Sequence, residues 1–185
     1  TDVMMSGKVA IVAGFGDVGA FIDMELTKAK DMLNLNCMTL MRLSYWAIEH
    51  MRKNKEGCII NVASTAAFQS LPYFSLYSAS KHFVLSFSEA ISMETKKDGI
   101  HVMSLCPGPT ESDFHKTAGI SKNRSAPFKA SSQDLAKYTY RAYQNKNTVA
   151  VHGVLNNILV FLNRLLPRYF IRIVTTKIFK KICQK

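Results

Sequence analysis

The chain has 185 residues, of which 48% are hydrophobic and 20% charged. This composition excludes an intrinsically disordered or fibrous protein and predicts one domain with its own core. The net charge is +11, but no acidic residue follows Asp134, so the excess belongs to the C-terminal tail. No aromatic stacking platform accompanies these cations, which argues against nucleic acid as the partner.

Four cysteines, Cys37, Cys58, Cys106 and Cys183, are far apart and form no C-x-x-C pair. No secretory signal precedes them, so we expect free thiols in a cytoplasmic setting, without disulfides or a metal site. The sequence opens on Thr1, and no N-terminal targeting segment can be read in it.

Predicted strands and helices alternate along the chain. Residues 8–13 (KVAIVA) are a continuous apolar run, as expected of a strand buried on both faces. Residues 25–53 repeat apolar positions near helical spacing, as one long helix or two that abut. Further strands are predicted over 58–64, 100–108 and 148–153, and helices over 73–97 and from about Gln133, capped by Ser132. The alternation predicts βαβ units and a Rossmann-like, doubly wound parallel sheet of about four strands.

Tyr77 and Lys81 lie four residues apart and share one face of the predicted helix over 73–97. A lysine ammonium beside a tyrosine favours the phenolate and lowers the pKa of the phenol, which suits it to acid–base chemistry. Alone, this spacing is weak evidence, because the chain has seven tyrosines. Ser64 strengthens it, since it ends the preceding strand at the edge where parallel sheets place their sites.

Four motifs together resemble the short-chain dehydrogenases/reductases. They are INVAS with Ser64, YSASK with Tyr77 and Lys81, the strand that ends in CPGPTESDF, and LNLN with Asn36, which falls where that family keeps a catalytic asparagine. The resemblance runs from about Ala13 to the C-terminus. It implies an oxidoreductase that uses NAD or NADP.

The resemblance also implies roles for individual residues. Tyr77 would be the general acid/base, Lys81 would lower its pKa and bind the nicotinamide ribose, and Ser64 would hydrogen-bond the reacting oxygen. Asn36 would hold a water that links Lys81 to solvent. The residues expected to border the nicotinamide are Pro107, Gly108, Thr110 and Ser112. Structural alternatives stay open: Ser64 as a strand-end cap, Asn36 as a polar helix residue and Tyr77 as a packed aromatic.

The front of the chain departs from the family pattern. Its first strand runs directly into AGFG and the next helix, so the family's cofactor-binding half is missing or replaced and the implied sheet is truncated. Residues 1–19 instead resemble the NAD-binding segment of S-adenosylhomocysteine hydrolase, which indicates a chimera joined in this stretch.

Gly14, Gly16 and Gly19 form a G-x-G-x-x-G pattern in this stretch, with two interpretations. They are either a phosphate cradle or a tight turn after a strand. A cradle needs a helix N-terminus that faces the pyrophosphate and an acidic residue about 20 positions further on, after a second strand. No second strand is predicted there. If residues 8–13 form an edge strand, we expect a homo-oligomer or other self-association through it.

Residues 154–185 are predicted as a basic helical extension of a domain over 1–153. The tail alternates apolar clusters with arginine and lysine, and Pro167 divides it. Its apolar runs are too short to span a bilayer. Two interpretations stay open: helices that close the substrate pocket, or a segment peripheral to an anionic membrane.

The leading hypothesis is an NAD(P)-dependent oxidoreductase that interconverts a carbonyl and a secondary alcohol on an apolar substrate, with residues 110–127 as a lid over it. The alternative is a non-catalytic remnant that binds membranes or a partner through its tail. S-adenosylhomocysteine hydrolase activity is not expected, since only the shared loop supports it.

Overall fold

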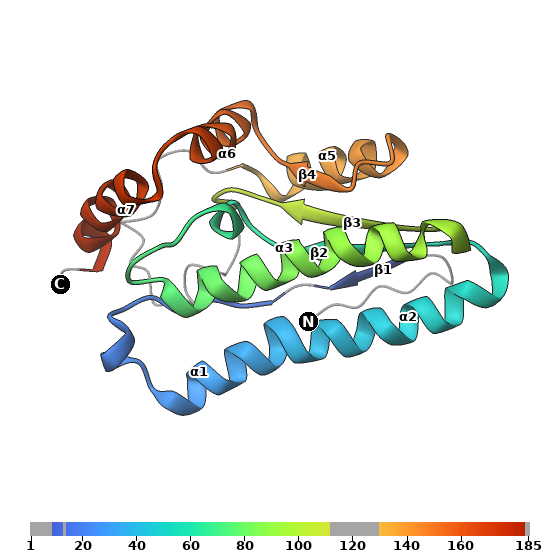
Figure 1. Cartoon of the computed structure of the whole chain (residues 1–185), viewed down its shortest axis with the longest axis horizontal. Helices are drawn as coiled ribbons and strands as arrows, with labels where there is room; N and C mark the ends of the chain where they lie inside the picture. Colours follow the sequence, from blue (N-terminus) through green and yellow to red (C-terminus); the bar gives the residue numbers. More distant parts are fainter. Residues whose placement is uncertain (1–8, 13, 112–129, 184–185) are drawn as a thin grey trace.

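The computed structural model describes residues 9–12, 14–111 and 130–183. Its centre is a four-stranded sheet in the order β1-β2-β3-β4 (Figure 1). The strands are β1 (Val9–Val12), β2 (Gly57–Val62), β3 (Ile100–Cys106) and β4 (Val149–Val151). Every neighbouring pair is parallel, with Ile11 opposite Ile60 and Ile59 opposite Val102. The predicted parallel sheet of about four strands is confirmed, and β1 lies at its edge.

The first long helix contains a π-helical segment. α1 (Leu26–Leu33) continues through the π-helical η2 (Asn34–Thr39) into α2 (Leu40–Asn54) without a break. The prediction over 25–53 left one helix or two helices open, and the structure shows one continuous rod with a wider turn in its middle.

The remaining helices also follow the predicted order. They are α3 (Ser75–Thr95), α5 (Ser132–Gln144), α6 (Val154–Leu165) and α7 (Arg168–Cys183), with short 3-10 turns η1 (Phe21–Asp23), η3 (Thr65–Phe68) and η4 (Lys96–Asp98). The predicted cap of α5 was wrong by one residue. Ser131, not Ser132, accepts a hydrogen bond from the Asp134 N–H at 3.0 Å, because Ser131 keeps the extended backbone that a cap needs.

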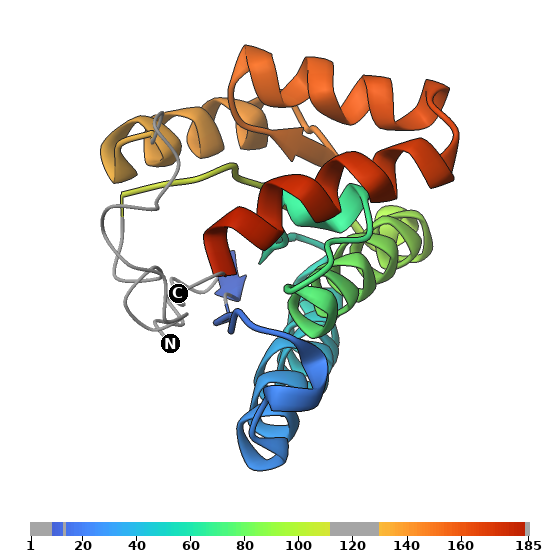
Figure 2. The same ribbon diagram turned by 90° about the vertical axis from the view of Figure 1, so that its left-hand side faces the viewer.

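Helices cover both faces of the sheet (Figure 2). On one face Ile59 and Val102 pack with Ala47 and Met51 of α2 and Ile91 of α3. On the other face the alternate strand residues pack against α5, in a cluster of Cys58, Ile60, Met103, Leu105, Ala142 and Ala150. Since successive strand residues point to opposite faces, continuous apolar runs such as CII need a cover on both sides.

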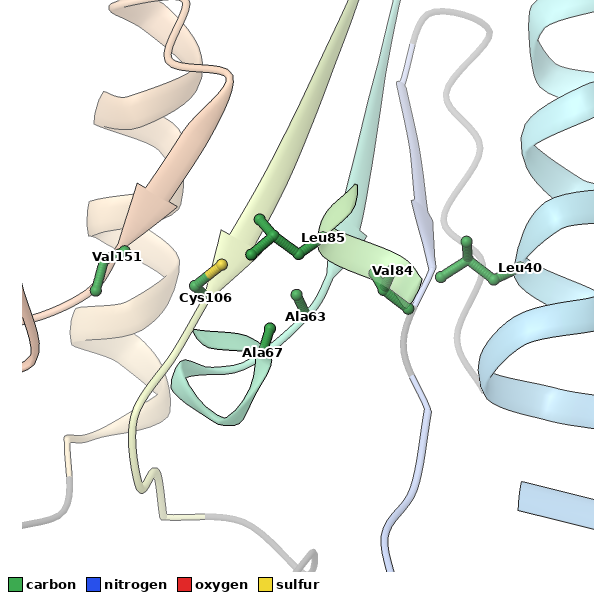
Figure 3. Close-up of a cluster of buried hydrophobic side chains, with 7 residues drawn as sticks. All are labelled: Leu40, Ala63, Ala67, Val84, Leu85, Cys106 and Val151. Atoms are coloured by element: carbon green, nitrogen blue, oxygen red, sulfur yellow. The ribbon is translucent and has the colours of Figure 1, made fainter. Parts of the chain in front are cut away.

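A third cluster lies at the carboxyl ends of the strands (Figure 3). Leu40 of α2 and Val84 and Leu85 of α3 contribute to it, together with Cys106 of β3 and Val151 of β4. This cluster fixes α3 against the strand ends and thereby positions the residues of the candidate site.

α6 and α7 form a helical pair beyond β4, beside the segment that joins β2 to α3 (Figures 1 and 2). Asn163 of α6 hydrogen-bonds Gln69, and Phe179 of α7 packs edge-on against Phe74 with ring centroids 5.1 Å apart. Within the described part of the chain, no helix is long and apolar enough to cross a membrane.

Candidate active site

Ser64 lies just beyond the carboxyl end of β2 and contacts Tyr77. Its side chain caps η3 by accepting a hydrogen bond from the Ala66 N–H at 3.1 Å. The same side chain hydrogen-bonds the Tyr77 side chain. Ser64 can therefore be both a cap and a site residue, because the cap fixes its Oγ where the Tyr77 phenol can reach it.

Lys81 lies one helical turn beyond Tyr77 and is 3% exposed. Its Nζ donates a hydrogen bond of 2.7 Å to the Val62 carbonyl oxygen and lies 5.8 Å from the centroid of the Tyr77 ring. Burial disfavours the ammonium and lowers the pKa of Lys81 from 10.5 to about 8. The amine therefore remains mostly charged at neutral pH, within reach of the phenol.

The pKa of Tyr77 is shifted in the direction opposite to the expected one. Burial raises the pKa of the phenol above its ordinary value, and the hydrogen bond with Ser64 lowers it only in part. The Lys81 ammonium points to the Val62 carbonyl and lies beside the ring, so it does not offset the burial. In this structure Tyr77 is therefore a neutral phenol, ready to donate a proton.

Asn36 is 1% exposed and sits in the π-helical segment η2. Its Oδ1 accepts from the Phe15 N–H at 3.0 Å, and its Nδ2 donates to the Phe15 carbonyl at 2.7 Å and to the Ser80 hydroxyl at 3.0 Å. The amide thus joins the segment after β1 to the helix that carries Tyr77. The water that Asn36 would hold remains a prediction, and its side chain has a further role that the sequence did not indicate.

Ser80 was missed by the sequence reasoning. Its hydroxyl accepts from Asn36 and donates to the Tyr77 carbonyl oxygen at 2.8 Å. The only signal for it in the sequence is its place between Tyr77 and Lys81 in YSASK.

Residues 14–20, which carry the three glycines, contain no helix and no regular turn, and they lie beside the start of α3. A Cβ on Gly14 would lie 2.0 Å from Asn36 Oδ1, and the Gly19 N–H donates to the Tyr73 carbonyl at 2.9 Å. Gly16 is buried. After Gly19 come the three-residue η1 and then α1, which begins at Leu26. Gly14 is thus required by its contact with Asn36, and both interpretations of these glycines, the phosphate cradle and the tight turn, remain predictions.

The residues after β3 lie beside η3. The Thr65 N–H donates to the Pro107 carbonyl at 3.0 Å, and Thr110 Oγ1 donates to the Gly108 carbonyl at 3.0 Å. A Cβ on Gly108 would lie 2.4 Å from Nδ2 of Asn156 in α6, a neighbour that the sequence did not predict. Ser112 lies outside the described residues, as does most of the predicted lid over 110–127.

The described residues fit one end of a dinucleotide better than the other. Ser64, Tyr77 and Lys81 place two hydroxyls and an ammonium together, which suits a carbonyl oxygen and a ribose. The pyrophosphate end needs a helix N-terminus with free N–H groups. The helix that follows the glycines directly in the sequence is the three-residue η1, and the start of α3 lies beside Gly19.

Comparison with known proteins identifies the family of the chain. A family model described as short chain dehydrogenase matches residues 7–123. The mouse 17-beta-hydroxysteroid dehydrogenase type 3 is 35% identical over 80 residues, which is 43% of this chain and 26% of that protein. The very-long-chain 3-oxoacyl-CoA reductase of Anas platyrhynchos is 34% identical over 109 residues, 58% of this chain and 35% of that protein. The chain therefore spans about a third or less of the length of these two relatives.

Among solved structures, a short-chain dehydrogenase from Sphingobium yanoikuyae in complex with NADPH superposes with a TM-score of 0.75. The identity is 23%, and the match covers 85% of this chain and 63% of that one. This similarity shows the Rossmann-like fold. The resemblance of residues 1–19 to S-adenosylhomocysteine hydrolase includes residues 1–8 and 13, which lie outside the described part, and it stays an expectation.

Proposed function

The chain belongs to the short-chain dehydrogenase family, and we propose that it carries the catalytic half of an NAD(P)-dependent oxidoreductase that interconverts a carbonyl and a secondary alcohol. The observation that supports this most is the convergence of Ser64, Tyr77 and Lys81 at one strand end. These residues come from two elements and from three different positions in the sequence. The hydroxyl groups of Ser64 and Tyr77 and the ammonium group of Lys81 therefore lie next to one another.

The residues of this chain would act as follows. In the reduction, the Tyr77 phenol donates its proton to the carbonyl oxygen while Ser64 Oγ holds the same oxygen by a hydrogen bond. The buried Lys81 ammonium stabilises the phenolate that forms, because opposite charges attract strongly away from water. A bound nicotinamide would supply or accept the hydride. Asn36 fixes the helix turn of Tyr77 through Ser80.

The substrate we infer is an apolar carbonyl compound or the matching alcohol. The two relatives named above are a hydroxysteroid dehydrogenase and a very-long-chain 3-oxoacyl-CoA reductase, and their names refer to a steroid and to a long acyl chain, which are both apolar. The candidate site has an apolar side, since Tyr77 packs in a cluster with Met32, Ala66, Leu71 and Phe74. We propose that the cofactor is either NAD or NADP. We also propose that the protein is cytoplasmic and self-associates.

A non-catalytic remnant that binds a membrane or a partner through its tail is the second candidate. The observation in its favour is the glycine segment, where Gly14 packs against Asn36 and no helix N-terminus follows directly. In this case Ser64, Tyr77 and Lys81 would keep their arrangement without a cofactor to use.

Cofactor titration and turnover separate the two candidates. We expect saturable binding of NADH or NADPH and reduction of an apolar ketone, with turnover at least about 100-fold lower in Tyr77→Phe because general acid catalysis is lost. Tyr140→Phe, at an exposed position on α5, serves as the matched control and should leave turnover unchanged. Turnover that persists in Tyr77→Phe contradicts the assigned role. No saturable binding of either cofactor would favour the remnant.

A further inference from the structure

The helix α6 exposes most of its apolar side chains to solvent. On the side of α6 that faces the body, Asn163 bonds Gln69 and Val160 packs against the cluster at the strand ends. Asn156 and Asn157 hold the start of the helix, where their Nδ2 atoms donate to the His152 and Val151 carbonyls at 2.7 and 2.8 Å. Its large apolar side chains are exposed, namely Val154, Leu155, Ile158, Leu159, Phe161, Leu162 and Leu165. A helix on the surface of a globular protein normally buries its apolar face.

The helix α7 adds to the same kind of surface. Its inner side carries Ile171, Thr175 and Phe179, of which Thr175 is buried and donates to the Ile171 carbonyl at 2.9 Å. Its exposed apolar side chains are Tyr169, Phe170, Ile173, Val174 and Ile178. We call the exposed side chains of residues 154–181 the tail surface. An apolar surface of this extent marks an interaction site.

The charge of the tail surface is of one sign. Its exposed cations are Arg164, Arg168, Arg172, Lys177, Lys180 and Lys181, and no acidic residue follows Asp134 anywhere in the sequence. A second copy seated on the same surface would bring like charges together, because a two-fold interface pairs a patch with itself. An anionic occupant is complementary instead.

We propose that the tail surface binds the face of a lipid bilayer that contains anionic headgroups. Basic residues mixed with large apolar side chains on a helix are the pattern of segments that lie in the headgroup region. α6 has 12 residues and is therefore about 18 Å long, shorter than the ~30 Å hydrocarbon core, so it lies in the interface and does not cross it. The cations meet the headgroups and the apolar side chains enter the acyl boundary.

The surface is joined to the candidate site. Phe179, on the inner side of α7, packs against Phe74, and both belong to the cluster that contains Tyr77. A membrane at the tail surface would therefore lie close to the place where an apolar substrate is expected. Binding of the tail to a membrane is compatible with both candidate functions, because the proposal concerns a surface apart from the catalytic residues, and its test requires no turnover.

The single tryptophan provides the reporter and the control. Trp46 lies on α2, 58% exposed, and Figures 1 and 2 show α2 and α6 on different sides of the molecule. We would move the reporter to α6 with Phe161→Trp in a Trp46→Phe background. With vesicles of phosphatidylcholine and phosphatidylserine at 7:3, the emission of this variant should shift to shorter wavelength, and that of the unmodified chain should not. No shift for the Phe161→Trp reporter, or an equal shift for Trp46, overturns the proposal.

Cosedimentation with vesicles measures the affinity. We expect the full chain to bind the phosphatidylserine vesicles at least tenfold more tightly than pure phosphatidylcholine, and less tightly in 0.5 M salt because the charges are screened. Replacing Phe161 and Phe170, which are 60% and 52% exposed, with glutamine should weaken binding at least tenfold. The control pair Phe21→Gln and Trp46→Gln removes equally exposed aromatic rings elsewhere and should leave binding unchanged.

Three results would overturn the proposal. They are no vesicle binding at all, binding that the control pair weakens as much as the tail pair, or a dimer that the tail pair dissolves while vesicles are ignored. The last result would assign the tail surface to a second copy of the chain.

Discussion

Asn36 holds both the N–H and the carbonyl of Phe15, at 3.0 and 2.7 Å, across 21 residues of chain. The buried amide of Asn36 thereby satisfies both backbone groups of Phe15, as the backbone of a neighbouring strand would. Its remaining Nδ2 proton goes to Ser80, one residue before Lys81. The segment after β1, the π-helical turn and the helix of the candidate site are thus connected by one side chain.

Gly14→Ala should be destabilising because of this contact. The new Cβ would lie 2.0 Å from Asn36 Oδ1, and displacing the amide breaks buried hydrogen bonds, so we expect a loss of about 3 kcal/mol in the free energy of unfolding. In an Asn36→Ala background the same substitution should cost less than about 1 kcal/mol, since the clash is gone. Urea denaturation of the four proteins measures the coupling.

Gly19→Ala is the control for this double-mutant cycle of Gly14→Ala and Asn36→Ala. Gly19 has a φ of +152°, and a Cβ added to it would meet nothing within 4 Å, so its cost is backbone strain alone. This cost should be the same in the unmodified chain and in the Asn36→Ala background. Additive effects of Gly14→Ala and Asn36→Ala would contradict the contact.

Lys81→Met should change how stability depends on pH. The pKa of Lys81 is about 8 in the folded chain, against 10.5 ordinarily, so the unfolded chain binds more protons between these values. The free energy of unfolding should therefore rise with pH from 8 to 10.5, by about 3 kcal/mol relative to Lys81→Met. Denaturant titrations of both proteins at several pH values measure this rise. A stability difference that does not vary with pH would contradict the buried ammonium.

Carbonyl reduction should slow as the pH rises through about 8. The pKa of Lys81 is about 8, whereas burial raises the pKa of Tyr77, so the ammonium is lost well before the phenol. The pH profile of kcat/KM tests this, and Lys81→Arg, which keeps its charge, should be slower but flat between pH 7 and 9.5. A decline that persists in Lys81→Arg would assign the titration to another group.

Ser131→Ala should cost about 1 kcal/mol through the loss of the α5 cap. Ser132→Ala removes only an exposed hydrogen bond to the Glu111 carbonyl and should cost less than half as much. Thermal unfolding of the two variants compares adjacent serines in one helix. Equal effects would refute the assignment of Ser131 as the cap.

The outer edge of β1 should favour self-association. β1 pairs with β2 and with no other described strand, and such an edge invites pairing with another chain. Sedimentation at micromolar concentration should show species larger than the monomer. The double variant Phe161→Gln, Phe170→Gln, which lacks two aromatic rings of the tail surface, should give the same result. A monodisperse, stable monomer would count against this prediction.

The sequence predicts best where its signals are local. The apolar run CII, bounded by Gly57 and followed by Ser64, specifies a buried strand and the place of the serine, and the spacing of Tyr77 and Lys81 places them on one helix face. These features depend on periodicity and on the rule that sites lie at the carboxyl ends of parallel strands.

What the sequence missed depends on pairs far apart in the chain. The bond between Asn163 and Gln69 spans 94 residues and joins one side of α6 to the body of the protein, and nothing in the tail itself reveals it. The pKa of Tyr77 depends on how deeply the ring is buried, which a Tyr-x-x-x-Lys spacing does not report. The prediction that the tail is helical is confirmed, but the sequence does not indicate which side of the tail helices faces the rest of the protein.

The π-helical turn over Asn34–Thr39 sets a limit on redesign of this protein. A π turn holds about one residue more than an α turn, so deleting one residue there would leave a regular α-helix that forms more readily by itself. The deletion would leave α1 and α2 in nearly the same rotational relation, because the wider turn absorbs the extra residue, but it would change the local backbone that carries Asn36. An engineer who regularised this helix would gain local stability but would disturb the backbone from which Asn36 reaches Phe15, so the irregular turn is the part of the helix to preserve.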